Sequence, residues 1–193
     1  MVIILSLLLA ACGGGAESGG STTPLEVEIE TPIPTPSITQ TGQTANSPYL
    51  DFSLGTISNG HAEIKVSLMT NEDWGGFCVL VAYDPATMEV VEARNDENFL
   101  IFGYNPDYNE ISTQPINPNL EPIVKNYHDK NLKVAMIIGG GVASNTGKTK
   151  LFILTIKNLK PNLDLTFDLY KLSGTAIEPR TQPSPTIVTI NNL

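Results

Sequence analysis

The clearest pattern along this chain is the strict alternation of polar and apolar residues at 61–68 (His-Ala-Glu-Ile-Lys-Val-Ser-Leu). A period of two is typical of a β-strand with one face in a core and the other in water. Residues 76–83 form a continuous apolar run instead, which predicts a strand that is covered on both faces or presents an apolar face to a partner. Five further segments have strand-like patterns: 88–93, 132–138, 150–156, 163–170 and 186–190.

Short turn signals separate these segments, among them Asn59-Gly60, Asp84-Pro85 and Ser173-Gly174. A convincing 3.6-residue apolar period over three turns is missing, and only residues 123–127 fit a single helical turn. Many short strands punctuated by turns predict an all-β, antiparallel β-sandwich over residues 49–193. The Pro- and Asn-rich segment 104–131 interrupts this pattern, and a loop of that length is usually functional or disordered.

The segment before the sandwich has a different composition. Residues 13–24 are rich in Gly, Ser and Thr, and prolines at 32, 34 and 36 favour an extended chain. Residues 25–30 alternate like a strand but have no neighbouring segment with which to pair. The sequence therefore predicts a disordered linker over residues 12–48.

Residues 2–11 are apolar apart from one serine and are followed by Cys12. This run is too short to span a bilayer as a helix but suits the apolar region of a signal peptide. Leu9-Ala10-Ala11-Cys12 resembles the lipobox of bacterial lipoproteins. The resemblance implies cleavage after residue 11 and a lipid on the Cys12 thiol. It also implies an exported protein held at the bacterial cell membrane or outer membrane, with its domain in the periplasm or outside the cell.

Composition and motifs argue against several classes of function. The net charge of −9 disfavours nucleic-acid binding through a basic patch. Residues 141–149 look like a phosphate-binding loop, but five residues lie between Gly141 and Gly147 where that motif has four, and a strand-like segment follows. Neither histidine has a partner at metal-ligand spacing, and no motif positions a nucleophile. We therefore predict a non-catalytic protein without a cofactor or metal.

Four acidic residues in predicted loops suggest one alternative, a metal site. A calcium site formed by them competes with solvated surface, which we favour. They are Asp96, Glu97, Asp107 and Glu110.

Several segments of the predicted sandwich follow the pattern of one known family. They are 62–68, Tyr83-Asp84-Pro85 at the end of the apolar run, Met88-Glu89-Val90-Val91, the turn 146–149 before 151–157, Leu165-Thr166-Phe167, and Gly174 before 187–190. In this order they resemble a cohesin domain, over residues 49–190. The resemblance implies a nine-stranded jelly-roll sandwich that binds a dockerin-like protein partner, with a link to polysaccharide degradation.

The resemblance also indicates a candidate binding strip. Cohesins that bind dockerins commonly carry polar residues on the outward face of the strand that ends in Tyr-Asp-Pro. Here that face has Gly76 and then Cys78, Leu80 and Ala82, an apolar strip. An exposed strip of this kind marks an interaction site, but coverage by residues 104–131 is the alternative.

Aromatic residues support a second hypothesis, a carbohydrate-binding module that holds polysaccharide near the cell surface. Trp74 lies in a predicted turn and, with Phe102, Tyr104, Tyr108 and Tyr127, could form a sugar-stacking platform. The alternative is that Trp74 caps the open end of the sandwich. Our first hypothesis remains a cell-envelope lipoprotein that presents a cohesin-like module to a protein partner.

Overall fold

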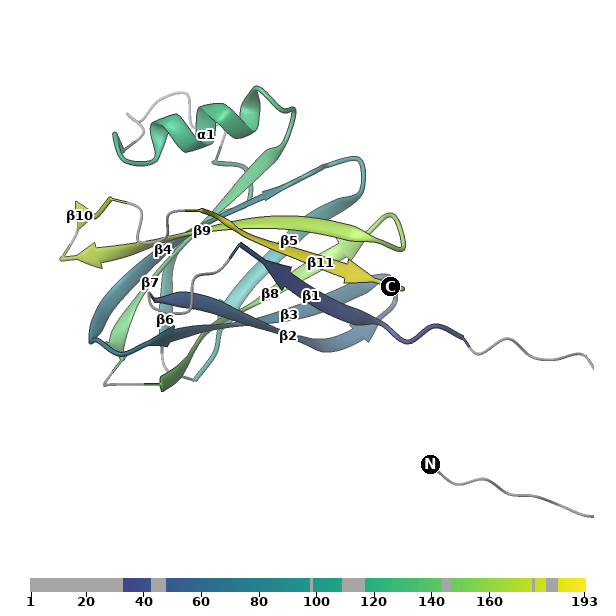
Figure 1. The fold of residues 1–193 in the computed structure, drawn as a ribbon, viewed down its shortest axis with the longest axis horizontal. Coiled ribbons are helices and arrows are strands. Elements are labelled where there is room, and N and C mark those ends of the chain that lie inside the picture. The colour runs from purple at the N-terminus through teal and green to yellow at the C-terminus, as the bar shows by residue number, and fades with distance from the viewer. Residues whose placement is uncertain are drawn as a thin grey trace, which may run out of the picture. The chain divides into compact units, whose positions relative to one another are not determined.

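The computed structural model describes residues 33–42, 48–97, 99–108, 117–143, 147–174, 176–179 and 184–193. The predicted signal peptide, Cys12 and the linker up to residue 32 lie outside these ranges. The described residues from Pro34 to Leu193 belong to one compact unit. It consists of two antiparallel sheets and one short helix, so the prediction of an all-β sandwich is confirmed (Figure 1).

The larger sheet has seven strands. Six form a path in the order β1 (Ser37–Thr41), β11 (Thr186–Asn191), β9 (Leu163–Ser173), β4 (Trp74–Tyr83), β7 (Lys133–Ala143) and β6 (Leu100–Asn105), and β10 (Ala176–Ile177) pairs with β9. The smaller sheet has the order β2 (Tyr49–Ser58), β3 (His61–Thr70), β8 (Gly147–Asn158) and β5 (Met88–Asn95). Every recorded pairing is antiparallel.

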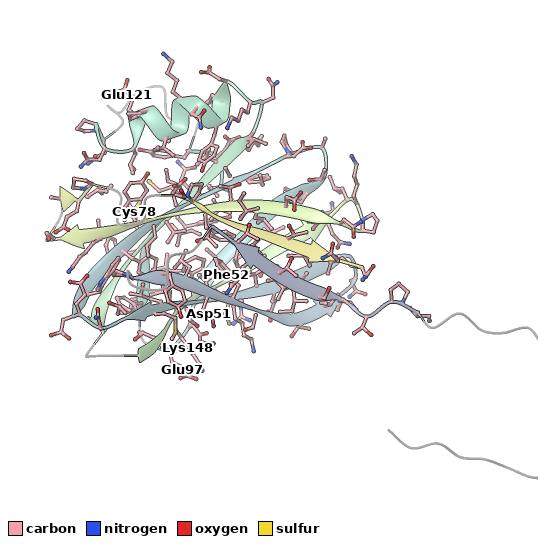
Figure 2. All side chains as sticks on the ribbon, viewed as in Figure 1. Asp51, Phe52, Cys78, Glu97, Glu121 and Lys148 are labelled. Atoms are coloured by element: carbon pink, nitrogen blue, oxygen red, sulfur yellow. The ribbon has the colours of Figure 1, made fainter. Side chains whose placement is uncertain are left out.

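The core lies between the two sheets, as the alternation along β3 predicts. Its even-numbered side chains from Ala62 to Leu68 are fully buried, whereas Lys65 is exposed. Phe52 of β2 points into the space between the sheets (Figure 2), and its ring centroid lies 4.7 Å from that of Phe167 on β9. Removal of these side chains from water supplies the main stabilisation of the sandwich.

Strand β4 is buried on both faces, which explains its continuous apolar run. Phe77, Val79 and Val81 enter the core between the sheets. Cys78 and its alternate neighbours face the other way into a second apolar cluster. We call this second side of the seven-stranded sheet the outer face.

Three phenylalanines pack tightly at one end of the core. The Phe77 ring lies edge-on to Phe99, with centroids 5.4 Å apart at 77°, and is stacked on Phe152 at 5.7 Å and 23°. Gly139 of β7 is opposite Phe77 in the register. A Cβ atom at Gly139 would lie 2.5 Å from the Phe77 ring, so close packing at this point requires glycine.

Three details of the prediction are wrong. The disordered linker does not extend to residue 48, because Ser37–Thr41 form β1, which pairs with β11 over five residues. The described residues form eleven strands rather than nine. Strands β2 and β6 were not predicted. The linker error has a physical reason: residues 37–41 form a strand because they pair with β11, which is distant in sequence, and the local sequence of residues 37–41 does not show that partner.

Candidate functional site

Helix α1 (Glu121–His128) covers part of the outer face. In Figure 1 it lies beside the seven-stranded sheet, on the side away from the smaller sheet. Glu121 in the first turn and Pro122 near the start both suit a helix N-terminus. The apolar side chains Leu120, Val124 and Tyr127 follow at intervals of four and three residues and all pack onto the sheet.

The helix ends in a Schellman-type turn. The backbone N–H of Asn131 donates to the carbonyl of His128 at 2.8 Å, and that of Leu132 donates to the carbonyl of Tyr127 at 3.1 Å. Asn131 has a φ of 59°, the left-handed conformation that this turn requires. The chain then enters β7 directly, so the helix position is set by the strand beneath it.

The predicted binding strip of Cys78, Leu80 and Ala82 lies under this helix. Their exposed fractions are 0%, 0% and 1%, and Figure 2 shows Cys78 between the sheet and α1. The strip is therefore not an open docking surface in this structure. The alternative, coverage by the segment 104–131, is what the structure has, because the apolar residues of α1 need the same surface for their own burial.

Several polar groups are enclosed with the strip. The Tyr127 hydroxyl of α1 donates a hydrogen bond to Oδ2 of Asp168 on β9, and Asp168 is buried. The Tyr170 hydroxyl is buried and has no hydrogen-bond partner among the described residues. Burial raises the pKa of Tyr170, and it raises the pKa of the Cys78 thiol to about 12. A buried thiol with a raised pKa is protonated near neutral pH and reacts slowly.

The proposed glycan-stacking residues do not form an exposed platform. Trp74 is only 1% exposed and packs into the core, where it fits the alternative of a cap at the end of the sandwich. Tyr108 and Tyr127 are buried in the cluster under α1. Tyr104 packs against the core, and burial raises its pKa to about 12. Because Trp74, Tyr108 and Tyr127 are buried and Tyr104 is only partly exposed, these four rings form no exposed stacking surface, and the prediction of this platform is wrong.

Two large apolar side chains of β6 are exposed on the outer face. Leu100 is 67% exposed and Phe102 68%. Ile101 between them packs against the core, so its two neighbours point to the opposite side. A Cβ atom at Gly140 of β7 would lie 2.9 Å from the Phe102 ring, so this ring rests beside bare backbone. We call Leu100 and Phe102 the apolar pair.

The apolar pair is continuous with the covered strip. Cys78 on β4 is paired with Ile138 on β7, and Ile138 is paired with Gly103 on β6. Ile138 also packs against the cluster under α1. The outer face thus has an open part at β6 and a closed part under the helix. The row from Cys78 through Ile138 to Gly103, the residue after Phe102, runs between the two parts. Phe102 was identified from the sequence, but Leu100 was missed. Residues 99–102 are all apolar, so their pattern does not indicate which face of the strand is buried.

Two of the four acidic loop residues lie close to lysines, and Asp96 Oδ1 accepts a hydrogen bond from the Glu97 N–H at 2.8 Å. Glu97 Oε1 lies 2.5 Å from Lys150 Nζ, and Asp107 Oδ2 lies 2.5 Å from Lys133 Nζ. Glu110 lies outside the described residues. Across the described ranges, no three His, Cys, Asp or Glu side chains gather closely enough to hold a metal ion. The arrangement of Asp96, Glu97 and Asp107, the three that are described, therefore gives the calcium alternative no support.

A small cavity lies at the corner between β4 and β5. It has a volume of about 240 Å³ and is lined by Tyr83, Pro85, Met88, Glu89, Lys133 and Leu159. One of its two charged residues, Lys133, is already paired with Asp107. Nothing in this lining resembles an acid–base pair or an activated nucleophile. In the part of the chain that is described, no helix has the length and apolar character needed to cross a membrane.

Neither family models nor curated proteins match this chain. Similar solved structures include a mutant of Streptococcus suis SadP, at 12% identity and a TM-score of 0.41, which covers 82% of this chain and 98% of that one. The Streptococcus suis adhesion Fhb bound to the disaccharide receptor Gb2 matches at 12% identity and a TM-score of 0.39, covering 82% and 100%. The second type II cohesin module from the adaptor ScaA scaffoldin of Acetivibrio cellulolyticus matches at 12% identity and a TM-score of 0.37, covering 74% and 93%.

Proposed function

We propose that this protein is a non-catalytic lipoprotein of the bacterial cell envelope that binds a protein partner through the outer face of its sandwich, with the apolar pair as the contact. The observation that carries the proposal is the exposure of Leu100 and Phe102, about two thirds each, on one strand. Single exposed apolar residues are common on protein surfaces. Two large ones side by side on a rigid sheet, next to bare glycine backbone, form a better anchor point.

The surroundings of the pair suit recognition rather than chemistry. Phe102 offers an aromatic side chain of the kind that dominates binding energy at interfaces. Its strand is held by β7 and by the hydrogen bond from the Ile101 N–H to Asn95 Oδ1 at 2.8 Å, which also blocks part of the sheet edge. A partner therefore contacts side chains here rather than adding a strand to the edge.

The N-terminal segment supports a tethered position for the domain. A lipid on Cys12 would leave residues 13–32 between the membrane and the described part of the chain. A stretch of that length spans at most about 70 Å when fully extended. The domain would thus reach partners well clear of the membrane while remaining bound to it, as expected for a presenting module.

Capture experiments with the full chain test the binding site. The Cys12→Ser protein, immobilised on beads, is incubated with proteins secreted by the source cells, and Phe102→Ser is compared with Ile187→Ser. Ile187 is a matched control because it is an exposed apolar residue on β11, far along the same sheet. We expect Phe102→Ser to weaken capture by about tenfold or more, the loss typical of an interface hot spot. Equal capture by both variants would refute the site.

Glycan binding is the second candidate, and one observation favours it. The exposed Phe102 ring lies beside Gly140, which leaves a flat surface of the kind on which sugar rings stack. The substitutions Phe102→Leu and Phe102→Tyr discriminate between the two functions. A protein partner tolerates leucine, because apolar area is retained, whereas a glycan requires an aromatic ring and tolerates only tyrosine. Binding to neither secreted proteins nor insoluble glycans would retire both candidates.

Lipidation is tested separately. Replacing Cys12 with alanine removes the only thiol that the lipobox could modify, and we expect the variant to leave the membrane fraction. A Cys78→Ala variant is the control and should stay with the membranes. Continued membrane association of Cys12→Ala would contradict the anchor without affecting the binding proposal.

A further inference from the structure

The packing between α1 and the outer face is unusual for a permanent core. Helix α1 and its N-cap residue bury apolar side chains against the sheet. The carboxylate of Asp168, the hydroxyls of Tyr127 and Tyr170 and the thiol of Cys78 are enclosed with them. The hydroxyl of Tyr170 has no hydrogen-bond partner among the described residues. Buried polar groups of this kind stabilise a closed core poorly, and each calls for an explanation.

The stability of α1 depends on its contacts with the sheet. The helix has eight residues, fewer than an isolated helix needs in water, so its stability depends on the sheet beneath it. Leu120 at its N-cap makes no side-chain capping bond. Besides its apolar contacts, it is tied by the Tyr127 hydroxyl to Asp168 and by Asn119 Nδ2 to the Ile177 carbonyl at 2.7 Å.

Each described end of α1 has a turn at which a change of backbone angle would move the helix. A turn precedes the helix, with the Leu120 N–H donating to the Asn117 carbonyl at 2.8 Å. Asn131, in the left-handed conformation, follows it. Changes of backbone angle at a few such terminal residues are sufficient to move a short element as a unit.

We propose that α1 is a lid, which lifts from the intact sandwich and joins the strip of Cys78, Leu80 and Ala82 to the apolar pair as one binding face. This proposal rests on the proposed function, because the lid would control how much of the outer face a protein partner can contact. In the closed state the strip is covered, whereas Leu100 and Phe102 are each about two thirds exposed. In the open state the row from Cys78 through Ile138 to Gly103 extends the same surface across three strands.

Cys78 offers a direct reporter of this motion. The sequence has two cysteines, so in the Cys12→Ser chain Cys78 is the only thiol. Its burial makes it unreactive while α1 is closed, and lifting of the helix exposes it to an aromatic disulfide reagent such as Ellman's reagent. We expect the reagent to label Cys78 under native conditions. The labelling rate should change little when low concentrations of urea are added, because lifting of α1 alone exposes little surface.

The variant Tyr127→Phe removes the hydroxyl that binds Asp168 and keeps the ring. We expect it to speed native labelling of Cys78 by about tenfold, within the range expected for the loss of one buried hydrogen bond. Tyr49→Phe on β2, in the opposite sheet, is the matched control and should label like the parent protein. If Tyr127→Phe folds poorly, hydrogen exchange of the unaltered protein serves instead, and the α1 amides should exchange well before those of β4 and β9.

Two results would overturn the lid. Labelling of Cys78 only at the rate and urea dependence of global unfolding would make α1 a fixed part of the core. Faster labelling of Tyr127→Phe with no gain in capture of secreted protein would show that opening does not regulate binding. Thiol labelling tests the lid without a binding partner. Unaltered capture by Phe102→Ser would refute the proposed function and would leave the labelling result unaffected.

Discussion

The contact between Gly139 and Phe77 permits a quantitative test of the packing. In Gly139→Ala the new Cβ would lie 2.5 Å from Cε1 and Cζ of Phe77 and 3.2 Å from the Leu100 carbonyl oxygen. The ring cannot move aside easily, because it is fully buried against Phe99 and Phe152. Gly75→Ala is the matched control, since nothing lies within 4 Å of the Cβ that it would introduce.

The expected size of the effect follows from two terms. Overpacking a well-filled core typically costs about 1–3 kcal/mol. Replacing glycine with alanine also restricts the unfolded chain, which stabilises both variants by about 0.4–1 kcal/mol. The second term cancels between Gly139→Ala and Gly75→Ala, so their free energies of unfolding should differ by about 1–3 kcal/mol. For a domain of this size that corresponds to a difference in Tm of about 2–12 °C.

Urea denaturation followed by circular dichroism measures this difference. We expect the urea midpoint of Gly139→Ala to fall with an unchanged m value, and that of Gly75→Ala to stay or rise. The substitution Phe77→Leu, made alone and together with Gly139→Ala, completes a double-mutant cycle. If the ring causes the strain, the double variant should be more stable than the sum of the single effects by about 0.5–3 kcal/mol. Equal midpoints for the two alanine variants would refute the reasoning.

Three further predictions concern the surface and the core. Gly140→Ala would place a Cβ 2.9 Å from the exposed Phe102 ring; because that ring can turn into solvent, stability should change by less than about 0.5 kcal/mol, while capture of the partner falls. Because Trp74 is buried, its fluorescence should have a short emission wavelength, resist quenching by iodide and stay unchanged when glycans are added. A change of its emission on addition of glycan would contradict this placement. Arg94 lowers the pKa of Glu63 below 4.5, chiefly through their hydrogen bond. The ion pair of Arg94 and Glu63 therefore stabilises the fold above pH 4.5, and this stabilisation is lost as the pH falls through the lowered pKa of Glu63. Arg94→Gln should lower the free energy of unfolding by about 0.2–1 kcal/mol near pH 7 and leave it unchanged near pH 2. Urea titrations at both pH values measure the difference.

The candidate site could be predicted only in part. Cys78, Leu80 and Ala82 were correctly placed on one apolar side of a strand, because that placement depends only on the alternation of a strand and on the residue types. That their cover is a helix from residues 121–128 depends on contacts between segments about 40 residues apart in sequence. Helix propensity gives a weak signal over so short a segment.

The aromatic residues illustrate the same limit. Trp74, Tyr104, Tyr108 and Tyr127 all lie in or beside polar segments, a pattern that fits exposed rings as well as rings that fold inward. The structure turns all four inward and leaves Phe102 outside. Which ring is covered depends on what packs against it, and a single sequence does not state that.

The sequence by itself determined the all-β class, most of the strands and the buried character of β4, because the period of side chains along a strand is a local property of the backbone. The tertiary structure alone decided which strands lie at the edges, that Ser37–Thr41 complete a sheet, and which part of the outer face is open. These features depend on pairing and burial between distant segments, whose free energy belongs to the assembled sandwich and to no single segment.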